Sequence, residues 1–161
     1  MSRKQRDQVD ETPLHTKIEQ ALTEARIIIP GAQALLGFQL LIVMTQSFDA
    51  LPTASKIMHA ASLGMVALTV ILLMAPAAYH RLVYAGEDTP ELHRMVSRMI
   101  TAATVPLALG LAGDVYVVIA KIFASEQFGV LMACIAALVC IGLWHGYPLL
   151  SARLSRRSRV R

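Results

Sequence analysis

The chain has 161 residues, of which 55% are hydrophobic and 16% are charged, and its formal net charge is +4. A soluble domain carries about 25% charged residues, and a disordered chain is poor in hydrophobic ones, so the composition excludes both classes. Two cysteines are too few for a disulfide-stapled secreted domain. The hydrophobic residues lie in four blocks, which predicts one membrane domain.

The N-terminal region is more polar than the rest of the chain. Residues 1–11 are charged and aperiodic, which predicts disorder. Thr12 and Pro13 then form a helix-start signal, with threonine as the N-cap. Over residues 12–26 hydrophobic side chains recur on one helical face. This pattern predicts an amphipathic helix at the membrane interface, with a kink at Pro30 where the first span begins.

Four segments are long and apolar enough to cross a bilayer as helices, which takes about 20 residues each. They are residues 27–47, 57–79, 99–120 and 128–150. No two-residue alternation of a membrane barrel is present, and a helix satisfies its own backbone polar groups in lipid. Thr89 and Pro90 give a second helix-start signal ahead of the third span. The predicted fold is therefore all-α: a four-transmembrane-helix bundle over residues 27–150 behind the interfacial helix, followed by a basic tail at 151–161.

The basic residues are distributed unevenly about these spans. Thirteen of the 15 Lys and Arg residues precede the first span, lie between the second and third, or follow the fourth, and the other two are Lys56 and Lys121. By the positive-inside rule both termini are cytoplasmic. Attraction of the basic tail to anionic lipid headgroups is compatible with this interpretation. Nucleic-acid binding is not expected, because no known nucleic-acid-binding motif is present.

Ionisable residues inside a membrane are costly and therefore mark candidate functional sites. Asp114 lies about two turns before the predicted outer end of the third span, and His59 and Gln39 are predicted in the outer halves of the second and first spans. A carboxylate with a neighbouring imidazole could carry protons or coordinate a cation. Two other interpretations remain open: a hydrogen-bonded Asp114 that ties helices together, or an ion pair between Asp114 and Lys121.

A second candidate group lies at the predicted cytoplasmic face. Its members are Glu24, Arg26, Gln33, Tyr79, His80, Arg81, His93 and His145. Such a group could bind an anionic headgroup, form salt bridges, transfer protons or bind a metal. No metal is expected, because structural metal sites usually need about four ligands. His80 and His145 could ligate a haem from facing helices, but a second well-placed pair is absent from the sequence, so no cofactor is expected.

Several short motifs resemble those of a known family. They are Glu24-x-Arg26, Gly31-x-Gln33 with Phe38 downstream, and the run from Ala75 through Pro76 to Tyr79, His80 and Arg81. Over roughly residues 19–120 the chain resembles a bacterial family of small multi-span membrane proteins of unknown function, some of whose members are labelled sodium:proton antiporters. The resemblance implies a location in the bacterial inner membrane. It also implies that the six residues Glu24, Arg26, Gln33, Tyr79, His80 and Arg81 form a shared feature at the inner face.

Two functions from different classes are expected from these patterns. The first is a small proton- or cation-linked transporter or channel protomer, assembled as a homo-oligomer because four short helices enclose little volume. The alternative is a non-catalytic accessory or lipid-interacting membrane subunit. An enzyme is not expected, because the sequence has no Ser/His/Asp set, phosphate-binding loop or cysteine-rich metal motif.

Overall fold

The computed structural model describes residues 14–83 and 89–151, and this part of the chain is helical without strands. The elements are α2 (Leu14–Val43), α3 (Gln46–Asp49), α4 (Thr53–Val83), α5 (Pro90–Phe123), α6 (Glu126–Ile141) and a π-helical turn, η1 (Gly142–Gly146). Four stretches of the described residues are long and apolar enough to cross a membrane: Ile18–Val43, Thr53–Tyr79, Pro90–Phe123 and Glu126–Ser151. The prediction of four apolar helices is confirmed, as expected for a multi-pass membrane protein.

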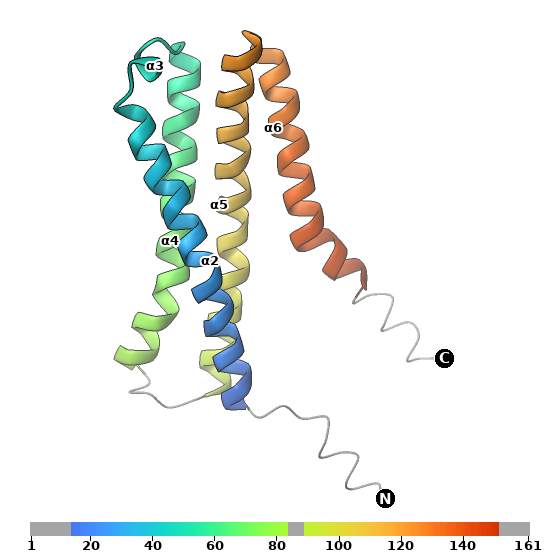
Figure 1. Ribbon diagram of the computed structural model, residues 1–161. Helices are drawn as coiled ribbons and strands as arrows, with labels where there is room; N and C mark the ends of the chain where they lie inside the picture. The colour runs from blue at the N-terminus through green and yellow to red at the C-terminus, as the bar shows by residue number, and fades with distance from the viewer. Residues whose placement is uncertain (1–13, 84–88, 152–161) are drawn as a thin grey trace, which may run out of the picture.

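The four long helices form a bundle organised around α5. Helix α5 contacts α2, α4 and α6, and α2 also contacts α4. Figure 1 shows α4 and α5 side by side, α2 crossing them, and α6 leaning away from α5 toward its C-terminal end. We refer to the end where α3 links α2 to α4 as the α3 end, and to the end where α2 begins and α4 finishes as the opposite end.

Local capping fixes where these helices begin and end. The Leu92 amide donates to Thr89 Oγ1 at 3.2 Å, and Pro90 occupies the first turn of α5, which confirms the predicted start signal. Helix α5 finishes at Ala124, whose φ of 48° is left-handed, and the Ser125 side chain caps α6. The other predicted start signal, Thr12-Pro13, and the predicted disordered N-terminus (1–11) lie outside the described residues. The predicted basic tail (151–161) also lies outside them, except for Ser151.

The N-terminal segment differs from the prediction, because α2 runs unbroken from Leu14 to Val43 with Pro30 inside it. The described part of the chain shows no break between the predicted interfacial helix (12–26) and the predicted first span (27–47), so an interfacial helix is not confirmed. The reason lies in the apolar face of this segment, which packs into the hydrophobic core. Ile18, Ala21 and Ala25 are buried there together with Leu73 of α4 and with Leu92, Val96, Ile100 and Ala103 of α5.

The buried face of α4 is polar in one half and apolar in the other. Its residues recur every three or four positions, as one side of a helix requires, and they are Ser55, His59, Ser62, Val66, Thr69, Leu73 and Pro76. The polar members begin at the α3 end, whereas Leu73 and Pro76 lie toward the opposite end. Helix α4 therefore brings polar groups into the bundle from the α3 end only.

Two glycines let α5 approach α4 closely. A Cβ atom at Gly110 would lie 2.6 Å from Val66 Cγ2, and one at Gly113 would lie 2.9 Å from Ser62 Cβ. Carbon atoms in good contact are about 3.5–4.0 Å apart, so neither position has room for a larger side chain. Small residues at helix contacts are typical of packed membrane helices.

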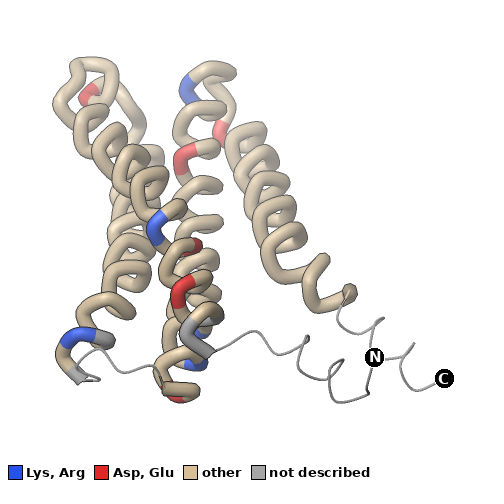
Figure 2. The backbone as a smooth tube through the Cα atoms, turned by 60° about the horizontal axis from the view of Figure 1, so that its bottom comes forward, with Lys and Arg blue, Asp and Glu red and all other residues tan. Residues whose placement is uncertain are grey.

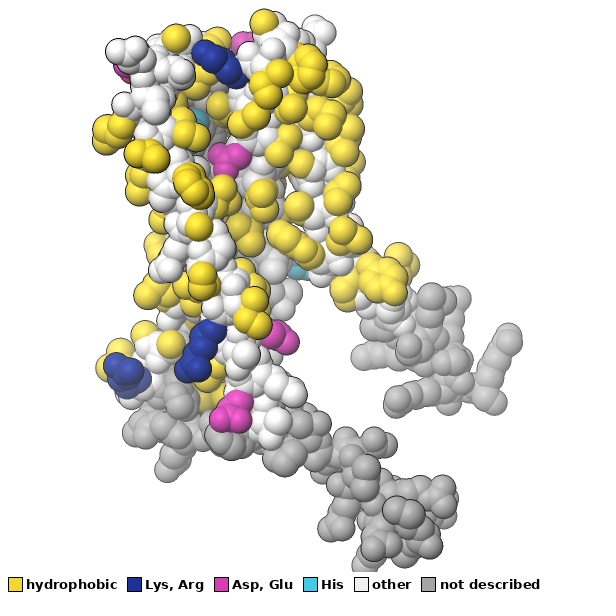
Figure 3. All heavy atoms as spheres, viewed as in Figure 1, with side chains coloured by type: hydrophobic (Ala, Val, Ile, Leu, Met, Phe, Trp, Pro, Cys, Tyr) yellow, Lys and Arg dark blue, Asp and Glu magenta, His cyan; other side chains and the backbone are white. Residues whose placement is uncertain are grey.

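The outer surface of the bundle is largely hydrophobic. Large apolar side chains are exposed on all four long helices, for example Ile27, Ile71, Val118 and Leu138, and Figure 3 shows hydrophobic side chains over much of the visible face. Charged residues are sparse, and α6 carries none after Glu126 (Figure 2). A surface of this kind is unusual for a water-soluble protein.

Candidate functional site

A polar cluster joins α2, α4 and α5 in the half of the bundle near the α3 end. Gln39 Nε2 donates to Asp114 Oδ1 at 2.9 Å and to Asp114 Oδ2 at 2.8 Å. Ser62 Oγ lies 2.8 Å from Asp114 Oδ1. Gln39 and Ser62 are each only 2% exposed, and Asp114 is half-buried. We call Gln39, Ser62, Asp114 and the main-chain carbonyl of Gly110 the Asp114 cluster.

The contacts of Ser62 determine how many hydrogens the Asp114 cluster accommodates. Ser62 Oγ lies 2.6 Å from the Gly110 carbonyl oxygen and accepts a hydrogen from Gln39 Nε2 at 2.8 Å. A carbonyl oxygen only accepts, and a serine hydroxyl has one hydrogen to donate. When that hydrogen is donated to Gly110, the short contact with Asp114 Oδ1 needs a hydrogen on the carboxyl group.

The cluster therefore has two hydrogen-bond arrangements that differ by one proton. With Asp114 as a carboxylic acid, Asp114 donates to Ser62 and Ser62 donates to Gly110, while the two hydrogens of Gln39 Nε2 are shared among Ser62 Oγ and the two Asp114 oxygens. With Asp114 as a carboxylate, the Ser62 hydroxyl donates to Asp114 instead, and the Gly110 oxygen then faces a hydroxyl oxygen without a hydrogen between them.

One polar atom of the Gln39 side chain, Oε1, takes no part in these hydrogen bonds. This oxygen is buried and has no hydrogen-bond partner within the described part of the chain. Buried polar atoms usually have a partner, either protein or water, so Oε1 is available to accept from a water molecule or to coordinate a cation next to the carboxyl group.

His59 supports α2 at the same level without touching the carboxyl group. Its Nε2 lies 3.0 Å from the Gln39 carbonyl oxygen, and because that oxygen only accepts, Nε2 carries the hydrogen. The imidazole is 3% exposed and packs edge-on against Phe48 at 5.2 Å between ring centroids. Of the three residues predicted for this site, Gln39 and Asp114 are in direct contact, and His59 reaches them through the main chain of Gln39.

The observed partners of Asp114 differ from the predicted ones, since Lys121 is not among them and Ser62 is. Within the described residues Asp114 is hydrogen-bonded to Gln39 and Ser62 and forms no ion pair with Lys121. Ser62 is absent from the predicted site, although its position three residues after His59 places it on the same helical face. That spacing is the signal that would have identified it.

A cavity at the α3 end lies directly above the polar half of α4. It has a volume of about 310 Å³ and is lined by Leu51, Pro52, Ser55, Ala120, Lys121, Ala124, Ser125 and Glu126. Ser55 is one helical turn before His59, and Ser62 is one turn after it, so polar side chains recur along this face of α4 between the cavity and Ser62, which contacts Asp114. In the other direction Val66 is fully buried, and the Thr69 hydroxyl donates to the Met65 carbonyl at 3.0 Å.

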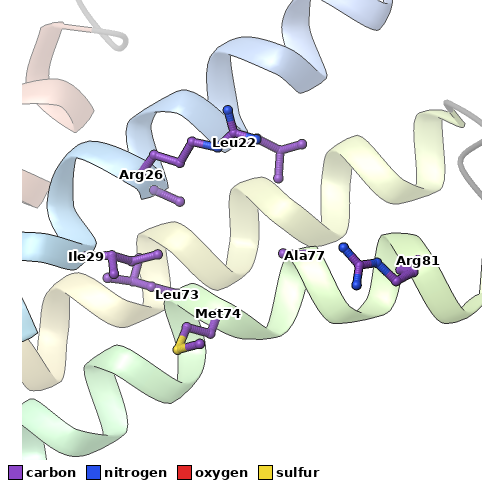
Figure 4. A pocket seen from close by; sticks show the side chains of 8 residues that line it. Leu22, Arg26, Ile29, Leu73, Met74, Ala77 and Arg81 are labelled. Atoms are coloured by element: carbon purple, nitrogen blue, oxygen red, sulfur yellow. The ribbon is translucent and has the colours of Figure 1, made fainter.

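The residues predicted as a cytoplasmic-face group are spread over several places. Arg26 and Arg81 line one cavity between α2 and α4 (Figure 4). Glu24, Gln33 and Tyr79 are exposed. The His80 side chain lies outside the described part of the structure.

The two other histidines of this group lie on different helices and face different surroundings. His93 is half-buried in the first turn of α5, and its Nδ1 has no partner among the described residues. His145 lies in η1, where its Nε2 is 2.8 Å from Thr104 Oγ1 of α5. In residues 14–83 and 89–151 no three His, Cys, Asp or Glu side chains gather as a metal site.

Comparison with known proteins gives a family and no function. No curated protein matches the chain, and no solved structure matches it. A family model described as a family of unknown function matches residues 9–148. The match extends over α6, beyond the motifs at residues 24–81 that carry the resemblance in the sequence. The chain therefore belongs to the family of unknown function DUF6328.

Proposed function

We propose that the chain is a small proton- or cation-linked transporter or channel protomer, and that Asp114 binds and releases the transported proton. The observation that carries the proposal is the Asp114 cluster. A carboxyl group is held by Gln39 from α2 and Ser62 from α4 inside a bundle of four predominantly apolar helices. Ionisable groups in such a position are costly and mark ion or proton pathways, and the two arrangements of the cluster differ by one proton.

The route to Asp114 starts at the α3 end. A proton enters the cavity lined by Ser55, passes the polar face of α4 and reaches the carboxyl group. When Asp114 releases its proton, the Ser62 hydroxyl turns and donates to Asp114 instead of to the Gly110 carbonyl. Each proton therefore changes which α5 atom accepts the hydrogen bond from Ser62 of α4. Toward the opposite end, the buried side chains Val66 and Leu73 fill the contact between α4 and its neighbours. Transfer of the proton to that side therefore requires α4 and α5 to move apart.

The proposed setting follows from the charge distribution and the family resemblance. Both termini lie in the cytoplasm of a bacterial cell, the protein spans the inner membrane, and the α3 end faces away from the cytoplasm. The uneven distribution of basic residues supports this orientation. The chain acts as a homo-oligomer without catalytic chemistry, since one four-helix bundle encloses little space for a pore.

Reconstitution tests the proposal directly. The purified protein is placed in liposomes that contain a pH-sensitive dye, and proton uptake is followed under an imposed pH gradient, with and without a sodium gradient. Asp114→Asn keeps hydrogen-bonding atoms in place but cannot release a proton, so the flux is expected to fall at least about tenfold, as expected when a group on an ion pathway is lost. Asp49→Asn is the matched control, because Asp49 is an exposed acidic residue at the α3 end, and its flux is expected to equal that of the wild type.

Three outcomes would contradict the proposal in different ways. A wild-type protein without proton or sodium flux would exclude the transport class. A flux that survives in Asp114→Asn would exclude this site while leaving the class open. Loss of flux in both Asp variants would indicate a general effect of charge at the α3 end rather than a proton site.

The alternative function, a non-catalytic accessory or lipid-interacting subunit, is supported by a different observation, the cavity with Arg26 and Arg81. Native mass spectrometry from mild detergent distinguishes the two functions. A homo-oligomer favours the transporter, whereas a larger complex with other proteins favours the accessory role.

A further inference from the structure

A second cavity lies between α2 and α4 near the opposite end of the bundle. Its volume is about 340 Å³, and its lining consists of six apolar residues and two arginines: Leu22, Ala25, Ile29, Leu73, Met74 and Ala77, with Arg26 and Arg81. Pockets that hold small ligands range over about 300–1,000 Å³. This cavity has room for part of a lipid, namely a phosphate group and the adjoining segment of one acyl chain, and the rest of the lipid would lie outside it.

The cavity carries two positive charges, from Arg26 and Arg81. Among the described residues, no Asp or Glu is part of its lining, and neither guanidinium has a hydrogen-bond or ion-pair partner there. Figure 4 shows that Arg26 comes from α2 and Arg81 from α4, and that in this view the two side chains extend toward each other over the apolar lining. Guanidinium groups bind phosphate through paired hydrogen bonds, so each of the two arginines offers donors that suit a phosphate group.

The apolar residues of the cavity continue from the arginines toward the middle of the bundle. Arg81 follows the apolar stretch that finishes at Tyr79, so it lies at the boundary where a membrane would meet water. Leu73 and Met74 lie about two turns deeper on α4. An occupant must therefore combine an anionic group at the boundary with hydrocarbon at greater depth.

We propose that this cavity binds one anionic phospholipid, with its phosphate between Arg26 and Arg81 and one acyl chain against Leu73 and Met74. Basic pockets between membrane helices are known recognition sites for anionic headgroups. A lipid of net negative charge compensates the two arginines, whereas a zwitterionic lipid adds its own positive charge. The inference rests on the proposed membrane location and not on the proposed transport activity.

The test uses the full-length protein in a non-ionic detergent. Phosphatidylglycerol is titrated in, bound lipid is counted by native mass spectrometry, and phosphatidylcholine with the same acyl chains serves as the comparison. The wild type is expected to prefer phosphatidylglycerol. Arg26→Gln and Arg81→Gln are each expected to weaken its binding about tenfold, because each removes a charge-assisted hydrogen bond, and the double variant is expected to lose the preference.

Two further variants separate this site from other effects. Arg98→Gln removes an exposed arginine of α5 that does not line the cavity, so it is expected to bind phosphatidylglycerol as the wild type does. Met74→Trp keeps both arginines but fills the cavity. Because Met74 is 53% exposed, the larger side chain is compatible with folding. This variant is expected to lose the bound lipid.

Four results would overturn the inference. They are equal binding of the two lipids by the wild type, unchanged binding in the double arginine variant, an equal loss in Arg98→Gln, and displacement of the lipid by millimolar inorganic phosphate alone. The last would indicate a site for free phosphate instead. None of these results bears on proton flux through Asp114, so failure of the lipid site and failure of the transport proposal are distinguishable.

Discussion

Replacing Gly110 by alanine is expected to destabilise the bundle, because α4 occupies the place of the new methyl group. A Cβ atom there would lie 2.6 Å from Val66 Cγ2 and 3.3 Å from the Ser62 carbonyl oxygen. Val66 is fully buried, and β-branched side chains have few alternative rotamers. Such overpacking costs about 1–3 kcal/mol, and the better helix propensity of alanine offsets about 0.5–1 kcal/mol. The net loss is therefore at most about 2.5 kcal/mol, with a central value of about 1 kcal/mol.

Gly64→Ala is the matched control, because a Cβ atom at Gly64 would meet no described atom within 4 Å. It is expected to be neutral or to stabilise the protein by up to about 1 kcal/mol. Unfolding of both variants in mixed detergent and dodecyl sulfate, followed by far-ultraviolet circular dichroism, gives the difference in free energy. If Gly110→Ala is as stable as Gly64→Ala, α4 and α5 are not in close contact there. The same contact holds Ser62 against the Gly110 carbonyl. Loss of this contact would therefore also remove the geometric basis of the proposed proton site.

Three further predictions use the same unfolding assay or hydrogen exchange. A double-mutant cycle with Gln39→Leu and Asp114→Leu is expected to give a coupling of about 0.6–1.7 kcal/mol, the range for hydrogen bonds between membrane helices; a coupling of zero would contradict the contact. Thr89→Ala removes the N-cap of α5 and is expected to cost about 1 kcal/mol, with no loss if the cap is not formed. Thr104→Val removes the partner of His145 and is expected to speed amide exchange in η1 several-fold, whereas unchanged exchange would show that this bond does not hold η1.

The number of long helices could be predicted from the sequence, whereas their ends could not. Bilayer thickness sets the length of an apolar run, so four runs predict four helices. The ends depend on capping instead. Helix α5 starts at Pro90 and continues to Phe123, well beyond the apolar run at 99–120, because a helix continues past the apolar run until a capping residue such as Thr89 or Ala124 stops it.

The N-terminal segment shows why an apolar face does not identify its own partner. The periodicity of Ile18, Ala21 and Ala25 fits a helix lying on a membrane, and it fits equally a helix packed on its neighbours. Core residues Leu73 and Leu92 cover this face. Only the tertiary arrangement distinguishes the two cases, since the pattern in the sequence is the same.

The members of the candidate site could be predicted better than their contacts. Asp114 and Gln39 are conspicuous as polar residues in apolar runs, whereas Ser62 is not, because serine is common in packed membrane helices. Contact between Gln39 and Asp114 depends on how α2 and α5 are rotated about their axes, and local sequence does not encode that rotation. Arg26 and Arg81 were likewise predicted at one face of the membrane, but their shared cavity depends on how α2 crosses α4.

The two proposed sites occupy opposite halves of the same pair of helices, and α4 explains the division. Its buried face changes from serine and histidine to leucine and proline along one line of contact, so the polar half holds the Asp114 cluster and the apolar half borders the arginine cavity. Ser62 and Leu73 are about 16 Å apart along the helix axis, and the two sites have no residue in common. Proton binding needs the desolvated carboxyl group near the α3 end, whereas lipid binding needs exposed arginines beside hydrocarbon. Helix α4 meets both requirements, because its buried face borders the Asp114 cluster in one half and the arginine cavity in the other.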